Sequence, residues 1–188
     1  MIYLLRHGET AWNTAGRYQG HKDSPLTRRG REQAASLGRM LAGVSQNLAI
    51  PLKTYVSPLG RAQETAEIIA RYVLMDRVEE PRLKEVSIGS WDGMSHYEVS
   101  MEYSDALSGT DAFDWFFRSP DGESFEAVKA RVSAWLHEAA VPSVAISHGL
   151  TGRIVRGVYL GLSDRTMLEL PVPQDGLYVL SDNDVRLL

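Results

Sequence analysis

Three short runs with strand character, each followed by polar side chains, limit what this chain can fold into. Residues 2–5, 52–56 and 144–147 each predict a buried strand. Stretches with the spacing of amphipathic helices separate these runs along the chain. Strands that alternate with helices favour an α/β fold built on a mostly parallel sheet.

The helices have recognisable start signals. Thr27 is a suitable N-cap for a helix with one apolar face, formed by Ala34, Leu37, Leu41 and Val44. Ser57 and Pro58 predict the start of a second helix, as its N-cap and its first helical residue. That helix carries an apolar stripe of Leu59, Ala62, Ala66, Ile69 and Val73. Two further amphipathic helices are expected within residues 125–139 and 151–159.

Residues 89–122 are less regular than the segments around them. They contain the aromatic cluster Trp115–Phe117, which we interpret either as an apolar wall for a substrate or as plain packing. A length of 188 residues is typical of one domain. We therefore expect a single domain over residues 1–188, with an insertion or lid at about 89–122. The tail, residues 167–188, alternates in polarity and predicts two or three strands.

Reactive side chains follow the predicted strands at the point where each strand ends. Arg6 and His7 follow the first strand, Ser57 follows the second shortly before Arg61, and His148 follows the third. In parallel sheets, ligands bind beyond the carboxyl ends of the strands. Because parallel strands bring these ends to one edge, the sequence predicts a site there.

The composition limits which ligands and settings are plausible. The formal net charge is −4, so no basic surface indicates nucleic-acid binding, and an anion must be held by a local cluster. The chain has no cysteine, which excludes disulfides, thiolate metal sites and a thiol nucleophile. No stretch approaches the roughly 20 apolar residues of a membrane span, and the first apolar run is too short for a signal peptide. We expect a soluble, cytoplasmic protein without a membrane partner.

Six short motifs follow one another along most of the chain. They lie in Leu5–Asn13, Tyr18–Gly30, Ser57–Ala66, Leu83–Gly93, Gly122–Ser124 and Ser147–Gly149. In this order they resemble the signature blocks of the histidine phosphatase superfamily, also called the phosphoglycerate-mutase-like family. One block alone has little specificity, but six in sequence are a strong signal. The resemblance implies a three-layer sandwich, with a mostly parallel central sheet and helices on both faces.

The chemistry of phosphate transfer explains the residue types in these motifs. A phosphomonoester carries nearly two negative charges at neutral pH, and fixed donors must hold its oxygens. Arg6 and Arg61 offer planar guanidinium forks that match phosphate oxygens. Asn13 offers an amide donor, and Gly149 offers a backbone N–H at an expected helix start, which favours an anion.

Two histidines belong to the matched blocks. A neutral imidazole can attack phosphorus and form a covalent phosphohistidine. Chemistry alone leaves open which histidine attacks. The resemblance implies that His7 is the nucleophile and that His148 stabilises the transferring group. No His-Glu-x-x-His spacing or other metal-ligand pattern is present, so we expect no metal and no cofactor.

The leaving group needs a proton donor. The matched block points to Glu85 as the general acid, which would later act as general base for water. Asp92 and Glu98 are the alternative candidates. The other interpretation of Glu85 is a solvated loop carboxylate, the usual state of this residue type.

The family contains mutases as well as phosphatases. Its mutases carry an inserted segment with extra basic residues after the acid block, whereas residues 92–122 contain Arg118 as their only Arg or Lys. Gln19 and Gly20, which the resemblance places among the substrate-binding residues, also match the phosphatase branch. We therefore expect a metal-independent histidine acid phosphatase-type phosphomonoesterase of the small bacterial branch, acting on a small phosphorylated metabolite.

Two alternatives remain open at this point. The first is a cofactor-dependent phosphoglycerate mutase. The second is a non-catalytic module that binds phosphorylated ligands. The second is disfavoured because family members of that kind usually lose the nucleophile or the acid, and this chain keeps both His7 and Glu85. Oligomeric state cannot be predicted from this sequence.

Overall fold

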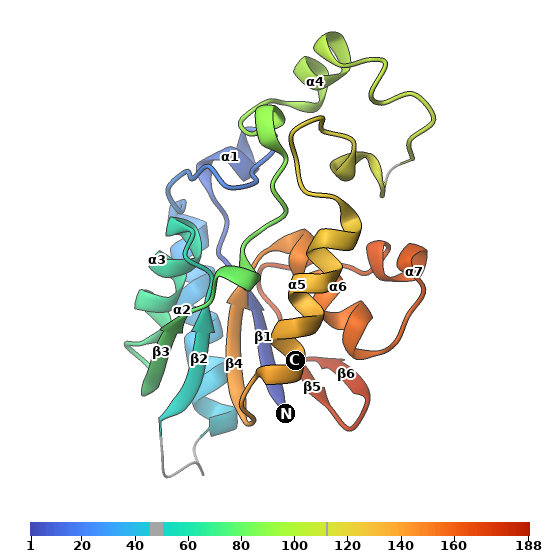
Figure 1. The fold of residues 1–188 in the computed structure, drawn as a ribbon. Coiled ribbons are helices and arrows are strands. Elements are labelled where there is room, and N and C mark those ends of the chain that lie inside the picture. Colours follow the sequence, from blue (N-terminus) through green and yellow to red (C-terminus); the bar gives the residue numbers. More distant parts are fainter. Residues whose placement is uncertain (46–50, 112) are drawn as a thin grey trace.

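The computed structural model describes residues 1–45, 51–111 and 113–188. Six strands form one sheet in the order β3-β2-β4-β1-β5-β6 (Figure 1). The first four of these strands run parallel, whereas β5 and β6 are antiparallel to their neighbours. The strands are β1 (Ile2–Arg6), β2 (Leu52–Val56), β3 (Met75–Glu79), β4 (Ser143–Ser147), β5 (Leu177–Ser181) and β6 (Asp184–Leu187).

Helices cover both faces of this sheet (Figure 1). The α-helices are α1 (Ala11–Thr14), α2 (Arg28–Ser45), α3 (Gly60–Ile69), α4 (His96–Glu102), α5 (Phe125–Glu138), α6 (Gly149–Tyr159) and α7 (Asp164–Leu168). Short 3-10 helices are formed by Pro81–Leu83, Gly89–Trp91 and Trp115–Phe117. The expected α/β sandwich with a mostly parallel central sheet is confirmed.

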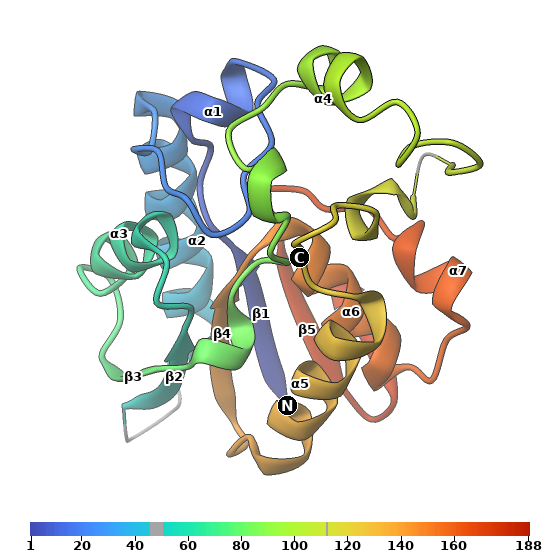
Figure 2. The same ribbon diagram turned by 45° about the horizontal axis from the view of Figure 1, so that its top comes forward.

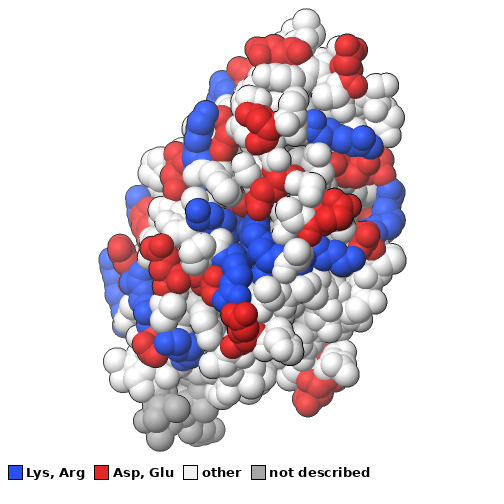
Figure 3. All heavy atoms as spheres, viewed as in Figure 1, with Lys and Arg blue, Asp and Glu red and all other residues white. Residues whose placement is uncertain are grey.

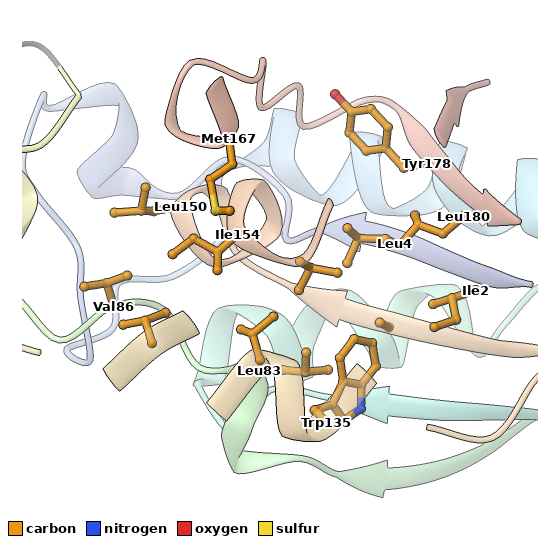
Figure 4. Packing of buried hydrophobic residues seen from close by; sticks show 14 of the residues in the cluster. Ile2, Leu4, Leu83, Val86, Trp135, Leu150, Ile154, Met167, Tyr178 and Leu180 are labelled. Carbon is orange, nitrogen blue, oxygen red and sulfur yellow. The ribbon is translucent and has the colours of Figure 1, made fainter. Parts of the chain in front are cut away.

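The period-two alternation of β1 divides the core into two layers. Ile2 and Leu4 pack with α5 and α6, as Figure 4 shows for Trp135 and Ile154. Tyr3 and Leu5 point to the opposite face and pack with α2 and α3. Burial of each such side chain stabilises the fold by about 1.5–3 kcal/mol. The strand that carries the first motif is thus fixed from both sides.

The first predicted helix begins where its cap predicts. The hydroxyl of Thr27 accepts a hydrogen bond from the backbone N–H of Gly30, the third residue of α2. Leu37 and Leu41 of its apolar face are fully buried. The expectation for Val44 was wrong, because this side chain is 39% exposed at the end of the helix.

The second predicted helix starts later than expected. Ser57 and Pro58 do not begin it; α3 starts at Gly60. Its N-terminus is capped from elsewhere in the chain, because the Asp23 carboxylate accepts hydrogen bonds from the backbone N–H groups of Gly60 (2.6 Å) and Arg61 (3.2 Å). Ser57 is thereby released from capping, and its hydroxyl lies 2.7 Å from Nε2 of His148.

The tail contains two strands, within the predicted two or three, although its first residues are helical. Met167 and Leu168 lie in the short helix α7, and only β5 and β6 are strands, so residues 167–188 supply two strands after a helical turn. Sequence reasoning also missed β3, an edge strand whose central residues Asp76 and Arg77 are charged and exposed. Its polar sequence hides the strand from a search for buried apolar runs.

The 89–122 segment lies above the carboxyl ends of β1 and β4 and carries α4 (Figures 1 and 2). It has a small core of its own, built from Ile88, Trp91, Val99 and Trp115. Ion pairs join it to the rest of the chain, between Glu98 and Arg17 and between Asp111 and Arg165. The segment therefore lies over the edge of the sheet at which the strands before the predicted site residues end.

Candidate active site

The strand ends meet as the sequence predicts. The ladder between β1 and β4 continues beyond the strands, because the His7 backbone N–H donates to the Ser147 carbonyl (3.0 Å). The Ser57 N–H donates to the Ile146 carbonyl, also at 3.0 Å. The rings of His7 and His148 consequently lie 5.1 Å apart, centroid to centroid, and only 3% and 2% of these two residues is exposed.

His7 is held as a neutral imidazole. Its Nδ1 lies 2.8 Å from the carbonyl of Gly8, and because a carbonyl can only accept, we assign the proton to Nδ1. Nε2 then keeps its lone pair, toward which Nε of Arg61 points at 3.3 Å. Burial, with the charges of Arg61 and Arg6, lowers the pKa of His7 well below its ordinary value. The unprotonated form is the one that can act as a nucleophile.

Arg61 lies in the first turn of α3 and is almost wholly committed to the protein. Its guanidinium donates to the carbonyls of Gly20 (2.7 Å) and Lys22 (3.0 Å) and to Asp23 (2.8 Å), besides pointing at His7. These contacts use four of its five N–H groups. Arg61 thus links the loop at residues 20–23 to His7. That its guanidinium also binds a phosphate stays a prediction.

Arg6, by contrast, opens into a cavity. One terminal nitrogen donates to the Val172 carbonyl (2.6 Å), and Nε is buried without a partner among the described residues. A Cβ at Gly149 would sit 3.4 Å from the Arg6 guanidinium, an ordinary contact distance, so this fork lies against the start of α6. Burial lowers the pKa of Arg6, and the nearby Glu85 carboxylate opposes this shift. Arg6 and the N-terminus of α6 together face the same space.

His148 occupies the N-cap position of α6, just before Gly149, and its side chain makes no hydrogen bond to the helix start. Its Nε2 lies 2.7 Å from the hydroxyl of Ser57, and its buried Nδ1 has no partner among the described residues. Burial and the charge of Arg61 lower the pKa of His148 well below the ordinary value. Ser57 therefore orients the second histidine, a role that its position after a strand signals only in retrospect.

The Glu85 carboxylate lies at the N-terminus of α6. It accepts hydrogen bonds from the backbone N–H groups of Leu150 (3.1 Å), Thr151 (2.9 Å) and Val86 (3.0 Å), and from the Thr151 hydroxyl (3.1 Å). A helix N-terminus favours a negative group at this position. Glu85 is therefore a fixed member of the cavity wall rather than a solvated loop residue.

A second group of residues, missed by sequence reasoning, fixes the backbone of Glu85. Arg131 of α5 donates to the carbonyls of Arg82 (2.6 Å), Lys84 (3.0 Å) and Glu85 (3.3 Å). It also makes a two-pronged ion pair with Glu123. Nε2 of His21 lies 3.0 Å from the Glu85 carbonyl as well. The Arg131 guanidinium thus binds three backbone carbonyls of the loop that ends at Glu85.

Asn13 and Gln19 both line the cavity. The side-chain oxygen of Asn13 accepts from the Thr10 N–H (3.1 Å) and from the Gln174 amide (3.0 Å), which leaves its amide nitrogen as a donor. The side-chain oxygen of Gln19 accepts from the Thr10 hydroxyl (2.8 Å). Thr10 therefore orients two of the predicted substrate-binding side chains.

Gly20 and the alternative acids have other partners. Gly20 accepts from Arg61 and donates to the Asp92 carboxylate (2.9 Å), which also accepts from the Lys22 N–H (2.7 Å). Glu98 pairs with Arg17 and closes the cap of α4. Asp92 and Glu98 thus organise loops, whereas Glu85 faces the cavity.

Six of the nine predicted site residues border a cavity of about 200 Å³, namely Arg6, His7, Asn13, Gln19, Glu85 and Gly149. Arg61, His148 and Gly20 lie behind this lining and do not border the cavity. On the face shown in Figure 3, Lys and Arg side chains gather near the middle among acidic ones. Trp115 packs in the small core of the 89–122 segment, as plain packing predicts, whereas Phe116 lines the cavity, and its role as a wall for a substrate stays a prediction. Helical spacing from Gly149 was a signal for Arg153. The lining residues not foreseen from the sequence are Arg17, Tyr18, Val86, Ile88, Leu150, Arg153 and Val172.

Two other features bear on the kind of protein. Within residues 1–45, 51–111 and 113–188, no group of three or more His, Asp or Glu side chains is arranged to hold a metal ion. In the same ranges, no helix is long and apolar enough to cross a membrane.

Comparison with known proteins identifies the family of this chain. Residues 2–186 match the model of the histidine phosphatase superfamily (branch 1). The chain is 36% identical over 176 residues to a "Probable phosphoglycerate mutase GpmB" of Enterobacter sp. (strain 638), which covers 90% of this chain and 75% of the relative. It is 39% identical over 140 residues to the adenosylcobalamin/alpha-ribazole phosphatase of Escherichia coli (strain K12), covering 72% and 64%.

Solved structures agree with the sequence matches. The alpha-ribazole phosphatase from Shigella flexneri superimposes with a TM-score of 0.79 at 28% identity, over 100% of this chain and 94% of that one. YhfR from Bacillus stearothermophilus gives a TM-score of 0.82 at 26% identity, over 99% and 94%. These matches span the sheet and all six motifs, and the chain therefore belongs to the histidine phosphatase superfamily.

Proposed function

We propose that this protein hydrolyses phosphomonoesters of small metabolites through a covalent phosphohistidine on His7. The observation that carries the proposal is a buried, neutral His7 whose Nε2 lone pair lies within a cluster of two arginines and a second histidine. Such a group can attack phosphorus, and the surrounding cations stabilise the charge on the transferring oxygens. Several relatives carry names of phosphatases that act on small phosphorylated compounds.

In the first step, Nε2 of His7 attacks phosphorus and forms a P–N bond, while the bond between phosphorus and the leaving oxygen breaks. The leaving oxygen takes a proton from the carboxyl group of Glu85. Arg6, Asn13 and the N-terminus of α6 at Gly149 face the cavity and would hold the phosphate oxygens. His148 would add a donor on the far side of His7.

In the second step, water attacks the phosphorus of phosphohistidine. Glu85, now a carboxylate, accepts a proton from this water as the P–N bond breaks. His7 returns to its neutral form and inorganic phosphate leaves. The same carboxyl group thus donates and then accepts one proton per turnover, which requires no metal ion and no cofactor.

Hydrolysis is favoured over mutase chemistry by the 89–122 segment. A mutase must hold a second phosphate, yet Arg118, the only Arg or Lys from 92 to 122, pairs with Asp114. We propose that residues 1–188 act as one domain in which this segment covers the site. The net charge of −4 and the size of the cavity favour small phosphorylated metabolites of the cytoplasm over nucleic acids.

The test is a screen of the purified protein against a panel of metabolite phosphates in the presence of EDTA. Release of inorganic phosphate, together with acid-labile, base-stable phosphate on His7 after rapid quenching, would support the proposal. A strict requirement for Zn²⁺, Mn²⁺ or Mg²⁺ would contradict it. Phosphate transfer between positions of phosphoglycerate, without release, would establish the mutase alternative.

A further inference from the structure

Arg156 is a buried arginine of α6 that lies outside the cavity. Only 3% of it is exposed, and it is not among the residues that line the cavity. None of the ion pairs formed by the described residues includes Arg156, and burial lowers its pKa. A buried cation without a carboxylate partner costs stability, which an apolar residue at the same place would not. What an apolar residue could not supply is the set of hydrogen bonds that this guanidinium donates.

These hydrogen bonds lead to residues 171–174, a segment between α7 and β5 that we call the strap. One terminal nitrogen of Arg156 donates to the Pro171 carbonyl (2.5 Å), and Nε donates to the Gly152 carbonyl of its own helix (3.2 Å). The guanidinium lies over the ring of Tyr178, 4.0 Å from its centroid, and the Tyr178 hydroxyl donates to the same Pro171 carbonyl (3.2 Å). Arg156 and Tyr178 together therefore hold one point of the strap.

The strap depends on side chains for its position. No backbone–backbone hydrogen bond joins residues 171–174 to the described parts of the chain. Pro171 and Pro173 have no N–H to donate in any case. Side-chain hydrogen bonds are therefore what fixes the strap, and Arg156 supplies one of them from outside the cavity.

The same strap holds Arg6. A terminal nitrogen of Arg6 donates to the Val172 carbonyl (2.6 Å), which is the only hydrogen bond of its guanidinium to the described residues. The carbonyls of Pro171 and Val172 belong to successive residues, so a shift of the first moves the second. Val172 also borders the cavity, so such a shift changes the cavity wall as well.

We propose that Arg156 is a positioning residue that holds the strap and thereby fixes Arg6 for the transferring phosphate. The inference rests on the proposed hydrolase function, because Arg156 makes no contact with the substrate and acts through Arg6. A displacement of about 1 Å at a substrate-positioning group can cost about 10²-fold in rate. Loss of Arg156 should therefore weaken catalysis as well as the fold.

A double-mutant cycle tests the proposal. Arg156→Leu keeps an apolar side chain in the core but removes the donors, and kcat/KM for an aryl phosphate should fall by about 10–100-fold. In an Arg6→Met background the same change should cost less than about 3-fold, because the group that it displaces is gone. Arg156→Lys keeps a donor and should recover part of the loss. Tyr178→Phe removes only the second donor to Pro171 and should have a smaller effect.

Val155→Ala is the matched control, because Val155 is a fully buried apolar residue next to Arg156 on α6. It should lower the melting temperature, while kcat/KM measured below that temperature stays close to the wild-type value. If Arg156→Leu behaved in the same way, or lost as much activity in the Arg6→Met background, Arg156 would be a purely structural residue and the proposal would be wrong.

Crystal structures of the Arg156 variants decide the point without turnover. The strap should shift, and the hydrogen bond between Arg6 and the Val172 carbonyl should lengthen or break, more in Arg156→Leu than in Arg156→Lys. An unchanged Arg6 would overturn the proposal, and Arg156→Lys provides the same comparison if Arg156→Leu does not fold. A wild type that hydrolyses no phosphomonoester would refute the proposed function, and the position of Arg6 in the variants would still decide whether Arg156 holds it.

Discussion

The two ends of the cavity are built in different ways. At the end that we propose binds the phosphate, called the phosphate end below, the buried side chains of His7 and His148 follow directly from strands β1 and β4 and are fixed by short hydrogen bonds. The far wall, with Phe116, belongs to the 89–122 segment, which has its own small core. Ion pairs of exposed side chains join it to the rest of the chain, as do the hydrogen bonds of Asp92 and the contact between Trp115 and Tyr18. The histidines of the proposed reaction thus follow the sheet strands, whereas part of the wall that we propose faces the leaving group belongs to a separate segment.

The largest expected effect is at the phosphate end. His7→Ala removes the proposed nucleophile, so turnover should fall by about 10⁶-fold, the scale seen when a nucleophile is lost. Phosphate release measured with an aryl phosphate checks this, and near-ultraviolet circular dichroism checks that the fold is kept. Activity near the wild-type level, or trapped phosphate on another residue, would remove His7 from the mechanism.

Glu85 should matter in proportion to the basicity of the leaving group. Glu85→Gln keeps the shape but cannot donate the proton, so phosphorylation of His7 by an alkyl phosphate should slow by about 10²–10⁴-fold. A nitrophenyl ester leaves with little help and should be affected less. Single-turnover rates are needed, because dephosphorylation also uses Glu85.

Glu98→Gln is the control for Glu85, since this carboxylate pairs with Arg17 in the 89–122 segment. Its two single-turnover rates should stay close to those of the wild type. If Glu85→Gln slowed both esters equally, Glu85 would be a binding group, and Asp92 or Glu98 would become the candidate acid.

Arg131 should act through Glu85. Arg131→Met releases three carbonyls of the loop at residues 82–85, and a small displacement of a catalytic group can cost up to about 10²-fold. We expect alkyl phosphates to lose about 10–10²-fold in single-turnover rate and aryl phosphates less. In the Glu85→Gln background the same change should cost little more. Additive losses in this double-mutant cycle would show a purely structural role.

Arg82→Met is the matched control for Arg131. Arg82 lies in the same loop, but its guanidinium pairs with Glu80 and Glu138 and makes no contact with the Glu85 backbone. Its loss should lower the melting temperature without changing the ratio of alkyl to aryl rates.

At the far wall, Phe116→Ala should change the selectivity between substrates more than the rate of phosphoryl transfer. Loss of apolar contact in a binding pocket is worth about 1–3 kcal/mol, or roughly 10–200-fold. We expect kcat/KM for a bulky aryl ester to fall by a factor near the lower end of that range, and kcat/KM for methyl phosphate to stay almost unchanged. Phe117→Ala is the control, because this neighbour packs against Phe125. Equal losses on both esters would mean that the segment also shapes the phosphate end.

The sequence predicts the phosphate end better than the far wall, for a physical reason. Arg6 ends β1, and His7 and His148 directly follow β1 and β4, so a correct strand assignment also places these side chains. Arg131 holds Glu85 from 46 residues away, and Asp23 caps α3 across a similar gap, so no local pattern encodes either contact. The same holds for Arg61, whose fork is taken up by the loop at residues 20–23.

Acid should weaken the fold through the phosphate end specifically. Burial and neighbouring arginines lower the pKa values of His7 and His148, so both stay unprotonated in the folded chain while the unfolded chain binds protons below about pH 6.5. The stability they contribute is complete above that pH and is lost as the pH falls. Each histidine should then reduce the free energy of unfolding by up to about 1.4 kcal/mol per pH unit.

Denaturant unfolding between pH 7.5 and 5.5 measures this slope. His7→Asn removes one of the two titrating groups and should make the slope shallower, even if the variant is less stable at every pH. His96→Asn changes an exposed histidine on α4, in the 89–122 segment, and should leave the slope as in the wild type. If both variants kept the full slope, the acid sensitivity would come from carboxylates elsewhere. A shallower slope in His7→Asn alone would assign the acid sensitivity to the histidine site beside the arginines at the ends of β1 and β4. The proposed chemistry requires an unprotonated imidazole at this site.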